Sequence, residues 1–497
     1  MSHNRFSRRH FFFGSLLAGA VPAGGFGSTA SLKMLGYRSP NEKLNIASIG
    51  AGGRAASDIS GCAPTENIVA LCDPDSENAM ATFNRFPKAT QYKDFRKMLD
   101  KEGKTIDAVI VAIPDFMHST AALWAMERGK HVYVEKPLTR TVWEARMLVE
   151  AAAKYKVATQ MGNQGYSNDG TRRCAEMIWA GEIGNVTEVH AWTNRPIWPQ
   201  GLTKIPPADP VPDTLDWDLW LGIAPPRPFT IGGEGYPTRD GNFYQPFNWR
   251  GFFDFGCGAL GDMACHILGA PNMALKLTAP TSVECVMQEG KSSFMFPKKS
   301  VIRFDFPARG SMPPVKIFWY DGVKAPPPRP AGLSEKERLG DIPVHRVPGH
   351  PPAPPRDTWS SQPIPTLPTD CTPDEWARAE NNGSLFVGDK GFLTAGTYGD
   401  GARLVPFEKM ADYKYPPEFL PRSPGHYRDW IRAAKGGEPA CSNFSVAGPL
   451  TEWIALGVVA LRFEGKLEWD AARMRVTNLP EANKYIKPVF RKGWGVT

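Results

Sequence analysis

The stretch IASIGAGGRA, residues 46–55, constrains the fold of this chain more than any other segment. Gly50, Gly52 and Ala55 match the pattern G-x-G-x-x-[GA], which lies between an apolar strand and an expected helix. Small residues at these positions permit a tight turn and let the backbone approach a pyrophosphate at the helix N-terminus. Because glycine turns are common, a sheet without a nucleotide stays the alternative for this stretch taken alone.

The segments that follow alternate between apolar strands and helices. Strands are predicted at residues 44–49, 68–71, 106–113, 131–134 and 157–161, and helices at 92–99, 118–128 and 142–156. Strands that are apolar along their whole length and separated by helices are typical of a parallel sheet that is buried on both faces. We therefore predict an α/β fold class, with a doubly wound parallel Rossmann sheet over residues 43–163.

The pattern changes after Gly162. The expected elements are a helix near 172–180, a strand at 186–192, strands of two-residue period at 301–306 and 315–320, and a helix near 450–462. Such alternation indicates a mainly antiparallel sheet with one covered face. We predict a second, α+β domain over residues 164–480, with a proline-rich surface insertion at about 325–369; the length of 497 residues suffices for both domains.

The N-terminal segment predicts export. NRFSRRHFFFGSLLAGAVPAGGFGSTA has a positive start, a short apolar run and then small residues, so residues 1–30 are expected to be a signal peptide. Ser7, Arg8 and Arg9 resemble a twin-arginine signal, although a chance arginine pair before an apolar run gives the same letters. The predicted location is periplasmic, without membrane insertion after signal removal, because the apolar run is too short to span a bilayer.

Charge and cysteine usage argue against two classes of partner. The formal net charge is +7, and no basic run with interleaved aromatic residues is present, so nucleic acid is not an expected partner. The eight cysteines are scattered without a CxxC pair, so no metal site is expected. Most of them are expected to be buried thiols. One or two disulfides are the alternative if the protein folds outside the cytoplasm.

Asp73 adds a second feature to the glycine turn. It ends the second predicted strand, about 20 residues after Gly53, where a carboxylate can bind an adenosine ribose and repel a 2′-phosphate. This favours NAD as cofactor. NADP stays possible, because Arg54 can meet a phosphate.

Two further strands end in polar residues at the predicted carboxyl edge of the sheet, where ligands bind in such folds. Pro114 and Asp115 follow one strand, and VYVEKPLTR places Glu135 and Lys136 after the next. A lysine partly desolvated beside a carboxylate can stabilise a developing alkoxide or take part in proton transfer. Taken alone, this segment favours a solvated lysine at a strand end. His118 is interpreted as the start of a helix.

The stretch NWRGFFDFGCGALGDMACHILG, residues 248–269, contains the third group of polar residues. Asp262 and His266 are four residues apart, so on a helix they share one face. A carboxylate can orient an imidazole, and a neutral imidazole can accept a hydroxyl proton. A helix-surface hydrogen bond is the alternative.

Together these residues resemble the glucose–fructose oxidoreductase / inositol dehydrogenase / MocA (Gfo/Idh/MocA) family. The likeness extends from about Leu44 to Asn478 and is carried by EKP at residues 135–137 and by the D-x-x-x-H of Asp262 and His266. TNRPIWPQG, LDWDLWLGIAPPRPF and CSNFSVAGPLTEW resemble its exported, twin-arginine branch. The resemblance implies a Rossmann domain, a C-terminal domain with an open, mainly antiparallel sheet, and a cleft where these residues meet.

The resemblance also implies roles for individual residues. Lys136 would bind the reacting hydroxyl, and His266, oriented by Asp262, would be the general base. The implied cofactor contacts are Gly50, Gly52, Gly53, Arg54, Asp73, Pro114, Glu135, Asn163, Trp249 and Arg250. Ala55 at the third glycine position and Met117 before His118 depart from the usual pattern.

The expected activity is oxidation of a secondary hydroxyl of a sugar or glycoside, for example at C3, by a tightly bound NAD. A redox-neutral glycosidase that oxidises C3 transiently, eliminates the substituent and re-reduces the sugar is the alternative. A carbohydrate-binding protein on a retired enzyme scaffold is a third reading. The resemblance implies a homo-oligomer, a dimer or tetramer, formed through the open sheet face.

Overall fold

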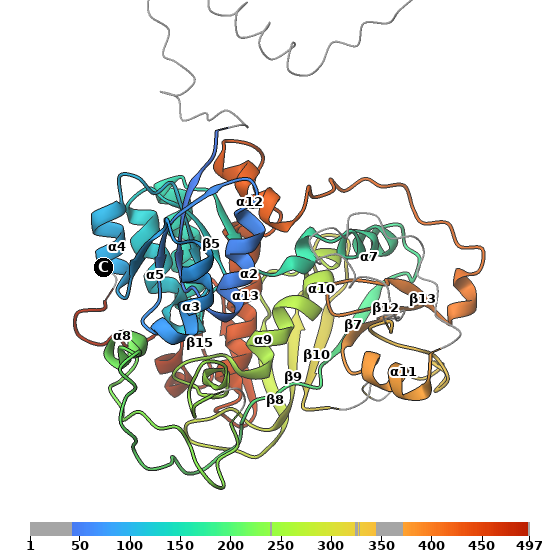
Figure 1. Ribbon diagram of the computed structural model, residues 1–497. Coiled ribbons are helices and arrows are strands. Elements are labelled where there is room, and N and C mark those ends of the chain that lie inside the picture. The colour runs from blue at the N-terminus through green and yellow to red at the C-terminus, as the bar shows by residue number, and fades with distance from the viewer. Residues whose placement is uncertain (1–41, 239–240, 324–326, 328, 344–370, 496–497) are drawn as a thin grey trace, which may run out of the picture. The chain divides into compact units, whose positions relative to one another are not determined.

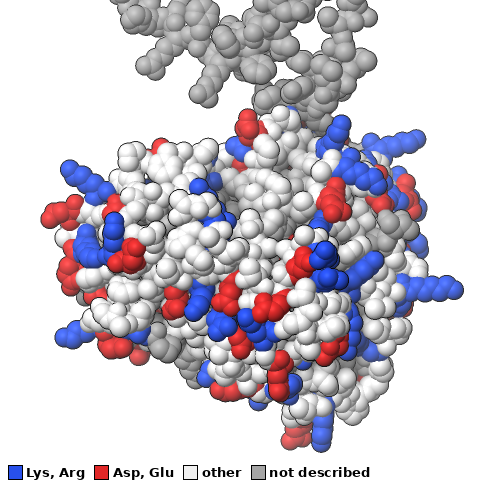
Figure 2. All heavy atoms as spheres, turned by 180° about the vertical axis from the view of Figure 1, so that it is seen from behind, with Lys and Arg blue, Asp and Glu red and all other residues white. Residues whose placement is uncertain are grey.

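The computed structural model describes residues 42–238, 241–323, 327, 329–343 and 371–495. The expected signal peptide, residues 1–30, and most of the proline-rich insertion therefore lie outside the described residues. Within the described residues, no helix is both long and apolar enough to cross a bilayer. On the face of the molecule shown in Figure 2, acidic and basic side chains are interspersed.

The first sheet has six strands, all parallel, in the order β3-β2-β1-β4-β5-β6. Its strands are β1 (Asn45–Ile49), β2 (Asn67–Cys72), β3 (Thr90–Tyr92), β4 (Ala108–Val111), β5 (His131–Val134) and β6 (Thr159–Met161). The predicted doubly wound parallel sheet is confirmed. The order reverses between β1 and β4, and ligands bind at such a switch point, outside the carboxyl ends of the strands.

Helices cover both faces of this sheet (Figure 1). They are α2 (Gly53–Cys62), α3 (Ser76–Arg85), α4 (Phe95–Glu102), α5 (His118–Glu127) and α6 (Val142–Tyr155). One prediction here is partly wrong, because Tyr92 lies in β3 and the helix expected at 92–99 begins at Phe95. The Asp94 side chain accepts a hydrogen bond from the Arg96 N–H, and this N-cap sets the later start.

One helix on the first sheet comes from the far end of the chain. Helix α12 (His426–Ala434) packs beside α2, and its Tyr427, Trp430 and Ile431 join the apolar layer on one face of the sheet. The sheet is therefore completed by residues more than 250 positions beyond its last strand.

The second sheet has nine strands in the order β13-β12-β11-β7-β10-β9-β8-β14-β15. They are β7 (Val186–Trp192), β8 (Ser282–Glu289), β9 (Lys299–Phe306), β10 (Val315–Asp321), β11 (Gly383–Gly388), β12 (Gly391–Ala395), β13 (Arg403–Val405), β14 (Lys466–Asp470) and β15 (Arg475–Val476). Only β7 and β10 pair in parallel. In β9 every second residue is buried, as the two-residue period predicted.

The helices after the first sheet include the one that carries Asp262 and His266. They are α7 (Asp169–Trp179), α8 (Trp217–Leu221), α9 (Gly258–Ile267), α10 (Gly269–Ala274), α11 (Pro373–Ala379) and α13 (Phe444–Ala460). Short 3-10 helices are η1 (Asp115–Met117), η2 (Gln164–Ser167), η3 (Asn248–Gly251), η5 (Phe407–Met410) and η6 (Pro480–Tyr485). Helix α13 begins six residues before its predicted start, because the Asn443 side chain caps it.

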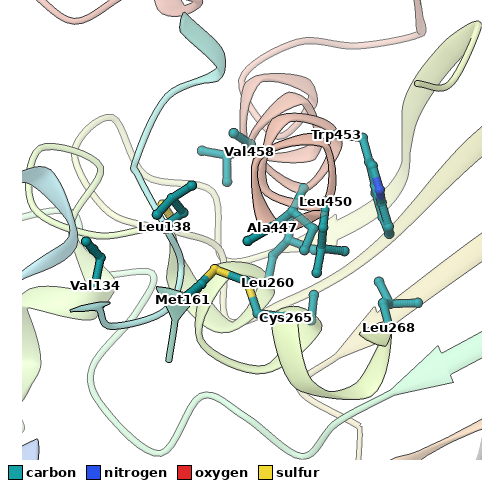
Figure 3. Packing of buried hydrophobic residues seen from close by; sticks show 14 of the residues in the cluster. Val134, Leu138, Met161, Leu260, Cys265, Leu268, Ala447, Leu450, Trp453 and Val458 are labelled. Atoms are coloured by element: carbon teal, nitrogen blue, oxygen red, sulfur yellow. The ribbon is translucent and has the colours of Figure 1, made fainter. Parts of the chain in front are cut away.

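Helix α13 joins the two sheets by packing against both α6 and α9. Figure 3 shows its Ala447, Leu450 and Val458 beside Leu138, which follows the EKP segment, and Leu260 of α9. Each buried leucine contributes roughly 1.5–3 kcal/mol through removal of apolar surface from water. This shared core fixes the EKP segment against α9.

All eight cysteines are free thiols, and five of them are buried. The one or two disulfides that the sequence allowed as an alternative therefore do not form in this structure. The expectation that most cysteines act as small buried hydrophobic residues is confirmed.

Candidate active site

A cavity of about 660 Å³ lies at the carboxyl edge of the first sheet and reaches α9 of the second domain. With the exception of Asn163, all predicted site residues line it: Gly50, Gly52, Gly53, Arg54, Asp73, Pro114, Glu135, Lys136, Trp249, Arg250, Asp262 and His266. The side chains predicted from separate stretches of sequence therefore meet at one place.

The glycine turn has the shape that a dinucleotide requires. Gly50 has a φ of +95°, and a Cβ on it would lie 2.2 Å from the Ala112 carbonyl oxygen. At Gly53 no atom lies within 4 Å of the Cβ position, so the backbone is open to the cavity. Helix α2 has no side-chain N-cap, which leaves its first N–H groups available to a pyrophosphate. These residues fit an NAD-type cofactor.

Asp73 supports the glycine turn directly. Its carboxylate accepts hydrogen bonds from the N–H groups of Ala51 (2.9 Å), Gly52 (3.3 Å) and Asp75 (3.0 Å). Burial raises the pKa of Asp73 to about 6, against the opposing effect of these hydrogen bonds. A carboxylate offers about four acceptor positions, so this arrangement leaves room for a ribose hydroxyl.

Lys136 reaches across from the first sheet to α9. Its ammonium donates to the Asp262 carboxylate at 2.7 Å and to the Asp262 carbonyl oxygen at 2.8 Å. Arg250 Nε donates to the same carboxylate oxygen at 3.1 Å. Burial alone would raise the pKa of Asp262, but the charges of Lys136 and Arg250 outweigh it and hold this pKa well below its usual range. The ammonium is thus fixed at the cavity wall.

His266 is placed one turn after Asp262 on α9, as predicted, but the predicted contact between them is absent. Among the described residues, the buried Nδ1 of His266 has no hydrogen-bond partner, and the imidazole packs against Tyr398 with ring centroids 4.8 Å apart. Asp262 therefore forms no hydrogen bond with His266 in this structure, and the orienting role that the resemblance implied stays a prediction. Asp262 binds an ammonium and a guanidinium instead, which form stronger, charge-assisted bonds than a neutral imidazole.

The His266 imidazole is neutral at working pH. Burial and the nearby Lys136 charge lower its pKa to about 3. It can accept a proton, but it is a weak base until negative charge develops beside it.

Glu135 and Arg54 form an ion pair beside the glycine turn. Glu135 Oε1 accepts from Arg54 Nε at 2.9 Å and from the Tyr133 hydroxyl at 3.2 Å. Burial would raise the pKa of Glu135, but Arg54 and Lys136 lower it overall. The Arg54 guanidinium also lies 3.0 Å from the Asp58 carboxylate. Both side chains border the cavity while engaged with each other, and their contacts with a cofactor stay predictions.

Asn163 does not line the cavity, although its neighbour Gln164 does, and its predicted place near the nicotinamide or substrate stays a prediction. It is fully buried, donates to the Cys265 carbonyl oxygen at 3.5 Å, and accepts from the Ser442 hydroxyl. It therefore braces the end of β6 against α9. Trp249 and Arg250 do border the cavity, with the guanidinium 4.3 Å from the Trp249 ring.

Asp115 is a buried carboxyl group in the cavity that the predicted set omitted. Its Oδ2 accepts from the Cys257 N–H at 3.1 Å. Burial raises its pKa to about 7, against the opposing effects of Arg250 and Lys136. The sequence feature that could have identified Asp115 as a site residue is its place beside Pro114, directly after a strand.

Two other residues, His118 and Tyr398, make contacts that the sequence did not predict. His118 starts α5 as interpreted, but its buried ring lies 2.8 Å from the Pro137 carbonyl oxygen and 2.7 Å from that of Ile113, so it ties the EKP segment to the β4 edge. Tyr398 reaches His266 from the loop after β12, and no motif marked it.

Comparison with known proteins agrees with both halves of this arrangement. Residues 44–163 match the oxidoreductase family with an NAD-binding Rossmann fold (GFO_IDH_MocA). Residues 179–293 match the C-terminal alpha/beta domain of the same family. Both matched segments contribute residues to the cavity.

Individual relatives are more distant. A glycosyl hydrolase family 109 protein of Solibacter usitatus is 30% identical over 185 residues, which are 34% of this chain and 41% of that protein. An inositol 2-dehydrogenase of Salmonella typhimurium is 29% identical over 155 residues, 30% of this chain and 44% of the relative. The chain thus matches less than half the length of these curated relatives.

The fold of the whole described chain has a counterpart among solved structures. The WlbA dehydrogenase of Bordetella pertussis, solved in complex with NADH and UDP-GlcNAcA, superposes with a TM-score of 0.52 at 15% identity, covering 86% of this chain and 99% of that chain. At this identity the likeness concerns the fold. Two segments of this chain are therefore similar to the two domains of the Gfo/Idh/MocA oxidoreductase family, and the fold is shared with a solved dehydrogenase.

Proposed function

We propose that this protein is a periplasmic NAD(P)-dependent oxidoreductase that transfers hydride between a secondary hydroxyl of a sugar or glycoside, at C3, and a tightly bound nicotinamide cofactor. One observation carries the proposal: the Lys136 ammonium from the first domain is held 2.7 Å from the Asp262 carboxylate of the second, in the cavity that also contains His266 and the glycine turn.

The residues that would hold the cofactor lie along the first sheet. The N–H groups at the start of α2 and the open face of Gly53 would receive the pyrophosphate, and Asp73 would receive the adenosine ribose. The Asp73 carboxylate would repel a 2′-phosphate, which favours NAD. When bound, the nicotinamide supplies the hydride acceptor and donor.

The chain's own groups would manage the proton and the oxygen. The Lys136 ammonium donates hydrogen bonds, so it would stabilise the substrate oxygen as this becomes an alkoxide. Neutral His266 would accept the hydroxyl proton, and the growing negative charge would raise its pKa from about 3 toward a useful range. Asp262 would position Lys136 through the contact already formed.

A redox-neutral glycosidase is the second candidate. The likeness to the family 109 glycosyl hydrolase protein of Solibacter usitatus favours it. In that reaction, transient oxidation at C3 acidifies the C2 proton, the glycosidic substituent leaves, water adds, and the same hydride returns to C3. The oxidation and re-reduction at C3 need the same residues as the dehydrogenase, while the elimination also needs a base for the C2 proton and a water molecule that adds at C1.

An aryl glycoside separates these two activities. If the protein is a glycosidase, incubation of the purified protein without an added electron acceptor should release the aryl alcohol. If it is a dehydrogenase, only a 3-keto product should form, and only when an electron acceptor is added.

Mass spectrometry of the gently denatured protein should detect co-purified NAD. Detection of NADP alone would refute the preference for NAD.

Substitution of Lys136 tests the catalytic assignment. We expect Lys136→Met to lower kcat by about 100-fold or more, because the charge that stabilises the alkoxide is lost. The exposed Lys101, in the last turn of α4, provides the matched control Lys101→Met, which should leave kcat unchanged. Equal turnover of Lys136→Met and the unmodified protein would end the assignment.

Export and assembly belong to the same proposal. Arg8 and Arg9 support twin-arginine export, and a fusion of residues 1–42 to a reporter should reach the periplasm only when both arginines are present.

We propose a homo-oligomer, a dimer or tetramer, through the face of the nine-stranded sheet away from α9. Light scattering after size exclusion should then give two or four times the chain mass.

A further inference from the structure

A second cavity, of about 360 Å³, lies away from the site described above. It is bounded by the start of α6, the end of α13, the loop at 223–225 and the C-terminal segment 484–489. None of its lining residues borders the first cavity. Its volume is within the range of about 300–1,000 Å³ that holds small-molecule ligands.

The lining of this cavity is strongly basic. Its charged residues are Arg140, Arg462, Lys484 and Lys487, with Asp254 as the single acid. Asp254 is already paired with Arg227. Among the described residues, none of the four basic side chains forms an ion pair with a carboxylate, and the basic side chains of the cavity wall outnumber the acidic one.

The two arginines are held in place rather than extended into solvent. Arg140 donates from one terminal nitrogen to the Phe253 carbonyl oxygen at 2.9 Å, while its buried Nε has no hydrogen-bond partner in the described structure. The Arg462 guanidinium stacks 3.8 Å from the Phe253 ring and 4.3 Å from the Tyr485 ring. Aromatic stacking fixes the plane of a guanidinium and leaves its edge free to bind an anion.

The remaining wall is apolar. Ile223, Pro225 and Val459 line it beside the Tyr485 ring. An inorganic ion would leave most of this volume unfilled, whereas an anionic group on a monosaccharide-sized body would occupy both parts. A guanidinium group binds a phosphate or carboxylate through two parallel hydrogen bonds, whereas a lysine ammonium binds it as a point charge.

We propose that this cavity binds a small oxyanion, a phosphate monoester or a carboxylate on a body of about monosaccharide size, with Arg140 and Arg462 as its ligands. Lys484 and Lys487, which are exposed at the rim, raise the local anion concentration. Two hydrogen bonds through Cys257 join this cavity to the first one. The Cys257 thiol donates to the Arg140 carbonyl oxygen, and the Cys257 N–H donates to the Asp115 carboxylate.

Calorimetric titration of the full chain, saturated with NADH so that no sugar can be oxidised, tests this proposal without reference to turnover. The probes are glucose 6-phosphate, gluconate and inorganic phosphate, with glucose as the neutral control. We expect binding of one or both sugar anions and at least about tenfold weaker binding of glucose, because only the anions can meet the guanidinium pair. Binding of glucose 6-phosphate alone assigns a phosphate site, and binding of gluconate alone assigns a carboxylate site.

Two variants locate the binding. Arg140→Gln should weaken the sugar anion by about tenfold or more, while Arg473→Gln, which removes the same charge from an exposed side chain elsewhere, should leave it unchanged. Lys487→Gln, at the exposed rim, should fold normally and weaken binding by a few-fold, with loss of part of the salt dependence. The proposal is overturned if no sugar anion binds at about 10 mM, or if neither Arg140→Gln nor Lys487→Gln weakens the binding of the sugar anions.

Discussion

Asp115 shows how one residue can acquire unusual properties from its surroundings. It is an ordinary aspartate in sequence, but in the folded chain it is 4% exposed and lies among Lys136, Arg250 and Asp262. Burial raises its pKa from 3.8 to about 7. A carboxyl group that titrates near neutral pH inside a cleft is typical of functional sites.

Replacing Asp115 by Asn tests the linkage between this pKa and stability. A raised folded pKa means that the stability of the unmodified protein falls as pH rises from about 4 to about 7. Asp115→Asn should therefore raise the free energy of unfolding at pH 8 by about 3 kcal/mol and change it little at pH 4. Urea denaturation at the two pH values measures this.

Asp262→Asn is the comparison of opposite sign. Its folded pKa is depressed, so its contribution is present above the unfolded pKa and is lost only as pH falls through the folded value. Asp262→Asn should lower stability at pH 8, because Lys136 and Arg250 lose their common partner. If both substitutions shift stability in the same direction at pH 8, the electrostatic assignment of this site is wrong.

At the level of elements, helix α6 illustrates how one capping motif can differ with its surroundings. Thr141 and Glu144 form a reciprocal capping box at its start, and buried Glu144 also accepts from the Ser119 hydroxyl at 2.5 Å. Helix α11 starts with the same motif, formed by the exposed Thr372 and the half-buried Glu375. The two helices therefore offer a matched pair.

Removing each capping threonine should separate burial from local geometry. Thr141→Ala should cost about 2 kcal/mol of unfolding free energy, because a buried carboxylate loses a hydrogen bond, and Thr372→Ala about 0.5–1 kcal/mol, because water replaces the lost contact. Thermal and urea denaturation measure both. Equal costs would show that burial of Glu144 has no energetic consequence.

For the molecule as a whole, the first sheet depends on the end of the chain. Helix α12 covers one of its faces, α13 packs against α6, and Arg146 of α6 forms an ion pair of 2.5 Å with Glu452 of α13. Residues 43–163 contain all six strands but neither of these helices.

A fragment of residues 43–163 should therefore fail to fold by itself. Without α12 the apolar face that includes Ile46, Ile110 and Tyr133 is exposed to water, and such a loss of burial removes several kcal/mol from a domain of this size. Circular dichroism should show no cooperative thermal transition for the fragment and a single one for residues 43–497. A cooperative transition in the fragment would show that the first sheet is energetically independent.

The sequence determined the local elements and the chemistry carried by each. Its periodicity located five of the six strands of the first sheet and three strands of the second, because burial repeats with the geometry of strand and helix, and its motifs supplied the glycine turn, Lys136, Asp262 and His266. The tertiary structure alone decided which groups are partners: Asp262 pairs with Lys136 rather than His266, Asn163 turns into the interior, and α12 completes a sheet far from it in sequence. The physical reason is that pairing and burial depend on distances in space, and segments hundreds of residues apart compete for the same charge or apolar face in ways that no local pattern records.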